Sequence, residues 1–138
     1  MNFLPAVIFI IACLLSFATG TSWGTFGILI PIVQNVFSMD NPLAIVCISA
    51  CMAGAVCGDH CSPISDTTIM ASAGAQCDHV NHVSTQLPYA ASCAVISGLC
   101  YILAGVLVEA GLPGLLALPA GIVGMLGFLY VMKQKQRA

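Results

Sequence analysis

An eleven-residue segment at positions 58–68 (GDHCSPISDTT) constrains this chain more than any other feature. It holds two of the five acidic residues, Asp59 and Asp66, and apolar sequence lies on both sides of it. A carboxylate near the centre of a bilayer costs roughly 2.5–3.5 kcal/mol on insertion scales. Gly58 and Pro63 interrupt helix geometry at the same place, and broken backbone at membrane depth is tolerated only where protein buries it or where it lines a cavity. The segment is therefore typical of an ion or substrate site inside a membrane protein.

The composition predicts an all-α integral membrane protein that lies in a lipid bilayer. Apolar residues make up 59% of the 138 residues and charged residues only 6%, which is far from the composition of a soluble domain. The basic residues are Lys133, Lys135 and Arg137, so no basic surface is available for a nucleic acid. The eight cysteines lie mostly in apolar runs and predict free thiols rather than a disulfide framework.

The second half of the chain contains two simple transmembrane helices. The segments 90–108 and 114–132 are free of charge, and each approaches the ~20 residues that a helix needs to cross a bilayer. A tight turn around Glu109 joins them. Before them, segment 77–88 carries apolar residues on one helical face and predicts a short interfacial helix.

The first half has shorter apolar runs, each followed by turn and hydroxyl residues. Short or Gly/Pro-interrupted hydrophobic segments are the best sequence indication of a transporter's binding site. We therefore interpret 3–37 as a re-entrant hairpin and 43–76 as a broken helix. The hairpin tip comprises Thr21, Ser22, Trp23 and Gly24.

The capping residues around the break predict where its helices end and begin. A helix that ends near Cys57 presents free carbonyl oxygens, which favour a cation. Ser62 suits an N-cap and Pro63 suits the first helical position, so a second helix is expected from Pro63 to about Ala75. Asp59 then lies in unwound backbone between the two helices.

The basic tail predicts the orientation in the membrane. Three basic residues directly after the last span favour a cytoplasmic C-terminus in the cytoplasmic (inner) membrane. Counting back along the spans puts Glu109 outside, segment 77–88 inside and Asp40 outside. The hairpin 3–37 then enters and leaves from the outside.

Several motifs in order resemble the C-terminal part of NhaC-type sodium/proton antiporters. They are residues 19–27 (TGTSWGTFG), 58–68, 77–79 (CDH) and 85–90 (TQLPYA). The resemblance covers essentially the whole chain as a single membrane domain, 1–138. It implies one of two inverted repeats, each with a re-entrant hairpin and a broken helix.

The resemblance also implies what the chain needs from elsewhere. Family members are several hundred residues long, so we expect either a missing N-terminal repeat or a homodimer partner to complete the transporter. We therefore expect no transport by this chain alone, and a fragment without activity is one alternative.

The candidate ion- and proton-binding residues lie in and beside the break. They are Asp59, Asp66, His60, Ser62, Ser65, Thr67 and Thr68. A carboxylate can hold either a proton or a cation, hydroxyls are neutral oxygen ligands, and an imidazole exchanges protons near neutral pH. The alternative for the carboxylates is helix capping, and for the hydroxyls it is bonding to nearby backbone.

The sequence thus predicts a sodium/proton antiporter segment rather than an enzyme. Sodium and protons are transported, and no cofactor is expected. Some relatives of this kind exchange organic acids such as malate and lactate, but no Lys or Arg lies in an apolar segment here to bind an anion, which favours a cation. A less favoured alternative is a membrane metal-binding protein built on Cys57, Asp59, His60 and Cys61, whose spacing lacks the usual second Cys pair.

Overall fold

The computed structural model describes residues 3–37 and 40–135 and consists of helices joined by short turns. No strand occurs within these ranges, which confirms the all-α prediction. The helices are α1 (Leu4–Thr19), α2 (Ser22–Val36), α3 (Pro42–Cys61), α4 (Asp66–Gly74), α5 (His79–Glu109), the 3₁₀ turn η1 (Gly114–Leu116) and α6 (Ala117–Lys135).

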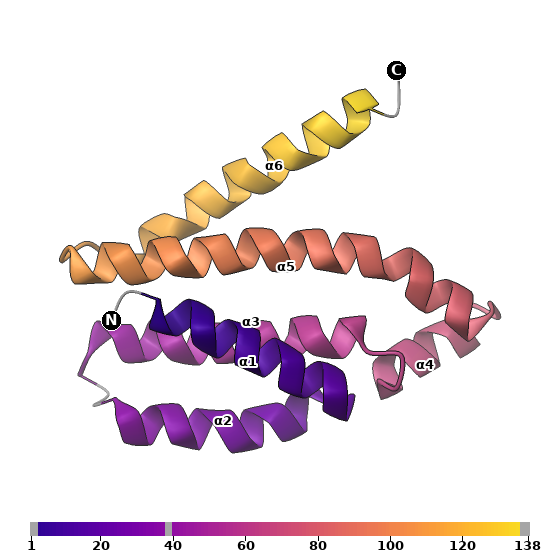
Figure 1. Cartoon of the computed structure of the whole chain (residues 1–138), viewed down its shortest axis with the longest axis horizontal. Helices are drawn as coiled ribbons and strands as arrows, with labels where there is room; N and C mark the ends of the chain where they lie inside the picture. The colour runs from indigo at the N-terminus through magenta and orange to yellow at the C-terminus, as the bar shows by residue number, and fades with distance from the viewer. Residues whose placement is uncertain (1–2, 38–39, 136–138) are drawn as a thin grey trace.

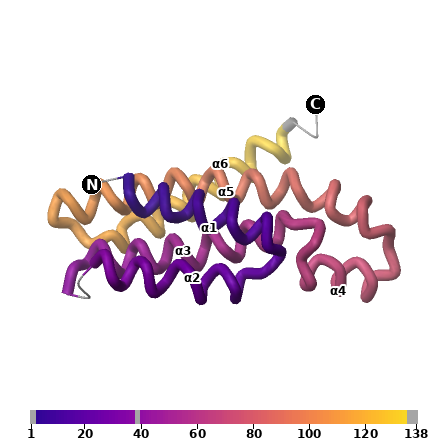
Figure 2. The backbone as a smooth tube through the Cα atoms, turned by 60° about the horizontal axis from the view of Figure 1, so that its bottom comes forward, coloured from indigo at the N-terminus to yellow at the C-terminus, as the bar shows by residue number. Residues whose placement is uncertain are grey.

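The first three helices pack side by side, and the last two lie along one flank of them (Figure 1). Helices α1 and α3 run in the same direction, whereas α2 and α5 run in the opposite direction. Figure 2 keeps α1, α2 and α3 together from a second angle and places α4 at the far end, beyond the end of α3. Helix α6 diverges from α5 towards the C-terminus.

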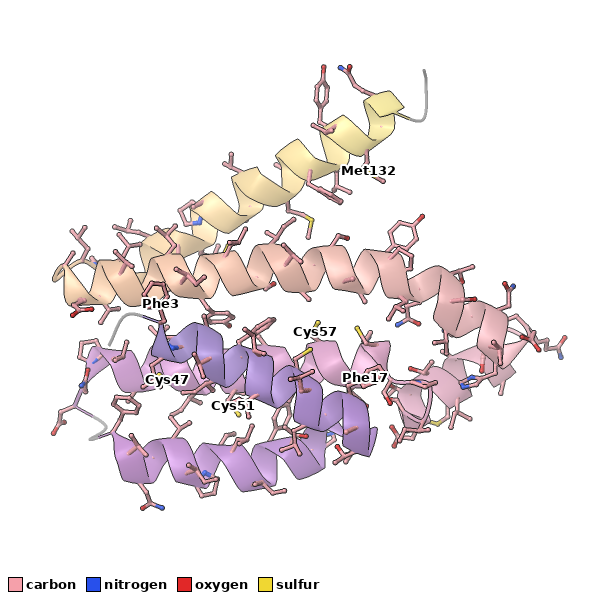
Figure 3. The ribbon with its side chains drawn as sticks, in the orientation of Figure 1. Phe3, Phe17, Cys47, Cys51, Cys57 and Met132 are labelled. Carbon is pink, nitrogen blue, oxygen red and sulfur yellow. The ribbon has the colours of Figure 1, made fainter. Side chains whose placement is uncertain are left out.

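Helices α1 and α3 approach each other closely enough for their backbones to touch. A Cβ atom at Gly54 would overlap the carbonyl oxygen of Phe9, and one at Gly58 would overlap that of Cys13. Glycines four residues apart permit such close packing between membrane helices. Figure 3 shows Cys47 and Cys51 on α3 in the region where α1 overlies that helix.

Segment 3–37 folds as a helical hairpin with a tight turn. Gly20 adopts the left-handed conformation, with φ 67°, and its N–H donates to the carbonyl oxygen of Ser16 over 2.8 Å. This is the usual glycine termination of a helix. Thr21 then caps α2, because its hydroxyl accepts a hydrogen bond from the N–H of Gly24.

The break between α3 and α4 lies further along the chain than its capping residues predict. Helix α3 continues past Cys57 to Cys61, so Asp59 belongs to its last turn and not to unwound backbone. Helix α4 begins at Asp66 rather than Pro63. Ser62 is extended, as expected for a residue before proline, and therefore ends α3 instead of starting α4.

Helix α5 is longer than predicted because it includes the segment expected as a separate interfacial helix. Asp78 caps it by accepting from the N–H of Asn81 over 2.9 Å, and the helix continues through Pro88 to Glu109. The N-terminal part of α5 is bent relative to the rest (Figure 1). A proline inside a helix removes one hydrogen bond and commonly produces such a bend without ending the helix.

Three helices within the described ranges are long and apolar enough to cross a membrane: Pro42–Cys61, His79–Glu109 and Gly114–Gln134. Most side chains of α6 are exposed, and nearly all of them are apolar. Apolar side chains without protein neighbours suit a lipid environment. The chain is therefore a multi-pass membrane protein.

Candidate functional site

The tip of the α1–α2 hairpin lies directly against the break between α3 and α4. A Cβ atom at Gly20 would lie 2.8 Å from the carbonyl oxygen of Ile64 and 3.0 Å from its Cγ1 atom. Figure 3 shows Phe17 near the end of α1 that faces the break. Two segments that the sequence predicts as polar interruptions, about forty residues apart, are therefore in contact.

Buried polar side chains gather around this contact, and we call them the polar cluster. Its members come from α1, α2, the end of α3, the break and the start of α4: Ser16, Thr25, Asp59, Ser62, Ser65 and Thr68. Four of the six, at positions 59, 62, 65 and 68, are predicted site residues. The other two, Ser16 and Thr25, lie outside the segment at 58–68.

The remaining predicted residues of the break are exposed. Asp66 lies in the first turn of α4, and its carboxylate accepts from the N–H of Thr67 over 2.7 Å. The hydroxyl groups of Thr67 and Ser65 form a hydrogen bond, with 2.8 Å between their oxygen atoms. His60 lines a cavity of about 530 Å³ between α1, α3 and α5, on the side of α3 that faces α5.

At the hairpin tip, Thr21 and Ser22 are half-buried, whereas Trp23 and Gly24 are exposed. Trp23 is 81% exposed and packs edge-on against Phe26, with ring centroids 5.9 Å apart. Its ring therefore covers α2 rather than the polar cluster. Thr25 is the next buried residue of α2, and its hydroxyl donates to the carbonyl oxygen of Thr21 over 3.0 Å.

Two buried oxygen atoms of the polar cluster have no hydrogen-bond partner among the described residues: Ser16 Oγ and Asp59 Oδ1. The Asp59 side chain is only 4% exposed. A buried carboxylate without a partner is costly, and such groups in a native fold need an explanation in terms of a ligand, water or function. The basic residues all lie beyond position 132, so no Lys or Arg occurs near Asp59 in the sequence.

The start of α5 holds the break in place through two side chains. His79 Nε2 lies 2.7 Å from the carbonyl oxygen of Pro63, and Gln86 Nε2 donates to that of His60 over 2.9 Å. Because a carbonyl only accepts, Nε2 of His79 carries a proton. Its Nδ1 lies 3.0 Å from Ser72 Oγ, which connects α5 to α4 as well.

This pair of contacts is missed by the sequence interpretation, which makes segment 77–88 a separate interfacial helix. His79 and Gln86 are seven residues apart and therefore share one helical face, which is a usable signal. This spacing can be used only once 77–88 is recognised as part of α5. Two polar residues on one face of that helix then indicate a polar neighbour.

A larger apolar groove lies elsewhere and is separate from the polar cluster. It encloses about 670 Å³ between the N-terminal half of α3, the C-terminal half of α5, and α6. Its walls include Ile45, Ala104 and Met125. One polar contact lies in it, between the hydroxyl groups of Ser49 and Tyr101 at 3.0 Å. No group of three or more His, Cys, Asp or Glu that could hold a metal ion occurs in the part of the chain that the structure describes.

Comparison with known proteins identifies the family. The model of the Na+/H+ antiporter family matches residues 1–106, which include the hairpin, the break and most of α5. This chain belongs to that family. The match confirms the resemblance seen in the motifs, and membership points to a transporter rather than an enzyme.

Curated relatives extend the comparison. An uncharacterized protein of Haemophilus influenzae is 46% identical over 98% of this chain and 25% of its own length. The malate-2H(+)/Na(+)-lactate antiporter of Bacillus subtilis is 36% identical over 70% of this chain and 20% of its own length. The arginine/ornithine antiporter of Halobacterium salinarum is 35% identical over 78% of this chain and 23% of its own length.

The chain spans about a quarter or less of the length of these relatives. No solved structure matches it. The described helices thus provide one part of the architecture that a family member of full length would have.

Proposed function

We propose that this chain forms the ion-binding part of a sodium/proton antiporter in the cytoplasmic membrane, with Asp59 as the group that carries the two ions in turn. The observation that supports this role is the unpaired Oδ1 atom of a nearly fully buried carboxylate, where the hairpin tip meets the break. Membership of the Na+/H+ antiporter family supports the choice of ions.

The mechanism follows from charge compensation. A carboxylate in a low-dielectric site needs either a bound proton, which neutralises it, or a bound cation, which balances it. Both ions then compete for Asp59, and only one is bound at a time. The carbonyl end of α3 lies beside Asp59 and favours the cation. Binding of sodium releases the proton, and binding of a proton releases sodium.

A complete transporter needs a second surface opposite the polar cluster. Inverted-repeat transporters bind their ions where two repeats meet. We propose that an N-terminal repeat, or a second copy of this chain, covers the hairpin tip and the break. Asp66 and Thr67 are exposed at the start of α4 and would then face that second surface. In the same transporter, α1 and α2 form a re-entrant hairpin.

The proposed orientation keeps the C-terminus cytoplasmic. The start of α3 and the end of α5 lie at one end of the bundle in Figure 1, and the start of α5 lies at the other. Asp40 and Glu109 are therefore external in this proposal and His79 is cytoplasmic. The basic residues that follow the last span support the assignment.

An organic-anion exchanger is the second candidate, favoured by relatives named as malate/lactate and arginine/ornithine antiporters. The N–H groups at the start of α4 are the available anion site, because a helix N-terminus attracts negative charge. Asp66 in that first turn opposes an anion. Transported sodium or protons therefore remain the better-supported ligands of the polar cluster.

The test of the proposed function is sodium-driven proton flux in everted membrane vesicles. The chain is co-expressed with the N-terminal half of a relative, in a host without its own sodium/proton exchange. Asp59→Asn preserves size but cannot release a proton, so coupled exchange should be abolished. Asp40→Asn makes the same chemical change at an exposed turn and should leave the flux unchanged. Wild-type flux in Asp59→Asn vesicles would exclude Asp59 as the carrier.

A further inference from the structure

Ser16 is the second unpaired oxygen of the polar cluster, and the sequence gives no hint of it. Its side chain is 0% exposed, and its hydroxyl has no partner among the described residues. A serine or threonine inside a helix normally bonds back to the carbonyl one turn earlier. Thr19 does so with Leu15, and Ser84 does so with Val80. The Ser16 hydroxyl is therefore left available although a backbone partner is usual.

The packing of α1 on α3 places Ser16 and Asp59 at the same level of the bundle. A Cβ atom at Gly58 would touch the Cys13 carbonyl oxygen and would lie 2.9 Å from the N atom of Phe17. Ser16 directly precedes Phe17, and Asp59 directly follows Gly58. The two unpaired oxygens thus belong to the chain neighbours of Phe17 and Gly58, whose backbones are in contact.

Helix spacing supports the same placement. Phe9, Ala12 and Ser16 follow one another on the buried face of α1. Phe9 and Ala12 both contact the position of Gly54 on α3. Because α1 and α3 run in parallel, Ser16 meets α3 about one turn beyond Gly54, where Gly58 and Asp59 lie.

The local electrostatics favour a positive ligand. Helix α1 ends at Thr19 and α3 ends at Cys61, so two parallel helices direct the negative ends of their dipoles to this place. Hard cations prefer oxygen ligands, and carbonyl ends of broken helices coordinate sodium in other transporter folds. One carboxylate oxygen and one hydroxyl oxygen, both buried and both unpaired, form a matching ligand set.

We propose that Ser16 Oγ and Asp59 Oδ1 bind the same dehydrated sodium ion, so that α1 supplies a ligand that joins the hairpin to the broken helix. This inference rests on the proposed function and adds a specific ligand to it. Removal of the hydroxyl leaves no other buried group unpaired, because Ser16 Oγ bonds to none. Its loss therefore weakens sodium binding without weakening the fold.

The test measures how sodium changes the thermal unfolding of the full chain in lipid nanodiscs. A ligand that binds only the folded state raises the melting temperature with its concentration. Sodium chloride should raise it for the wild-type chain, and choline chloride at equal ionic strength should not. For Ser16→Ala, the melting temperature without sodium should be unchanged or slightly higher, and half-maximal stabilisation should need at least about tenfold more sodium.

A matched control separates a ligand from a structural serine. Ser72 is also buried, but its hydroxyl donates to the Ile69 carbonyl oxygen over 2.9 Å. Ser72→Ala should lower the melting temperature without sodium and leave the sodium response intact. Ser16→Cys keeps a side chain of similar size but offers a soft sulfur, so it should lose the sodium response as Ser16→Ala does.

Two results would overturn the inference. If Ser16→Ala responds to sodium as the wild type does while Asp59→Asn does not respond, Ser16 is no ligand, and the role of Asp59 in exchange stands. If sodium and choline have equal effects on the wild-type chain, the two oxygens bind no sodium in this chain. The vesicle flux of the co-expressed transporter decides the proposed function separately in either case.

Discussion

The interface between α1 and α3 and the last helix, α6, show two ways in which an apolar helix can be held in this protein. At the first, glycines bring two backbones into contact and leave no room for a methyl group at Gly54 or Gly58. Along α6, Gly124 and Gly127 have no atom within 4 Å of an added Cβ. At the first contact the two backbones leave no space for an added methyl group, whereas α6 packs against α5 and leaves open space beside two of its glycines.

The more tightly packed of the two regions is also the one that contains the polar cluster. The polar cluster is built on the ends of α1 and α3, and the family match at residues 1–106 ends before α6 begins. A cation site needs ligands held in fixed geometry, whereas a helix that faces lipid needs only apolar character. Tight packing therefore accompanies the part of the chain in which we propose the ion site.

The largest effect is expected from filling the α1–α3 contact. Gly58→Val places side-chain atoms where the Cys13 carbonyl and the Phe17 backbone already lie, so α1 must move away from α3. We expect a loss of at least about 3 kcal/mol in the free energy of unfolding, the upper range for overpacking. Reversible unfolding in detergent micelles measures it.

Gly124→Val is the matched control, because the same side chain enters open space on α6. Its effect should stay within about 0.5 kcal/mol, as for ordinary surface substitutions. Equal losses for the two variants would show that α1 and α3 are no more tightly packed than α6, which would remove the contrast between the two regions.

A smaller effect is expected at the contact between α5 and the break. His79→Ala removes the bond to the Pro63 carbonyl and the bond to the Ser72 hydroxyl. The loss should be about 1–3 kcal/mol, because two hydrogen bonds of about 0.5–1.5 kcal/mol each are removed. His82→Ala changes a half-buried histidine one turn later and should cost less. Hydrogen exchange of residues 62–65 should rise in the first variant and not in the second.

The sequence was sufficient for the class of fold and for the two polar interruptions, for identifiable reasons. Gly20 ends α1 in the left-handed conformation, and this local chemistry sets the hairpin turn. Pro63 likewise marks the break, although the helix expected to begin at this residue begins at Asp66. Local signals of this kind depend on neighbouring residues only, so they can be read without the rest of the fold.

The helix boundaries and two of the six residues of the polar cluster could not be read in this way. Gly58 looks like a helix terminator, but its contact with α1 supports the helix through Asp59 to Cys61. Ser16 is a single hydroxyl in an apolar run and gains meaning only from its burial against α3. The role of His79 depends on the carbonyl of Pro63, sixteen residues away. Each of these facts is a tertiary contact, which local propensity does not encode.

A modest effect is expected where α5 meets α3, at the border between the two regions. The Tyr101 hydroxyl bonds to Ser49, and its ring packs against Phe9 with centroids 5.4 Å apart. Tyr101→Phe keeps the ring contact and removes only the hydroxyl, so the loss should be near 0.6 kcal/mol, the mean for hydrogen bonds between membrane helices. Ser49→Ala should give a similar loss. A double variant that loses no more than either single one would confirm that the two hydroxyls act as one contact.

The smallest effect is expected on α6, and it sharpens the contrast most directly. Leu126 is 61% exposed, so Leu126→Ala removes few contacts with protein and should change the free energy of unfolding by less than about 0.5 kcal/mol. Phe9→Ala shortens a side chain that is 4% exposed between α1, α3 and α5, and it should cost about 3–5 kcal/mol. Unfolding of both variants in the same detergent compares the two losses in the free energy of unfolding.

A loss at Leu126 comparable with that at Phe9 would mean that α6 is buried in the assembled transporter or in a dimer of this chain. Cross-linking through a cysteine placed at position 126, in a background without the native cysteines, would then identify the helix that covers it.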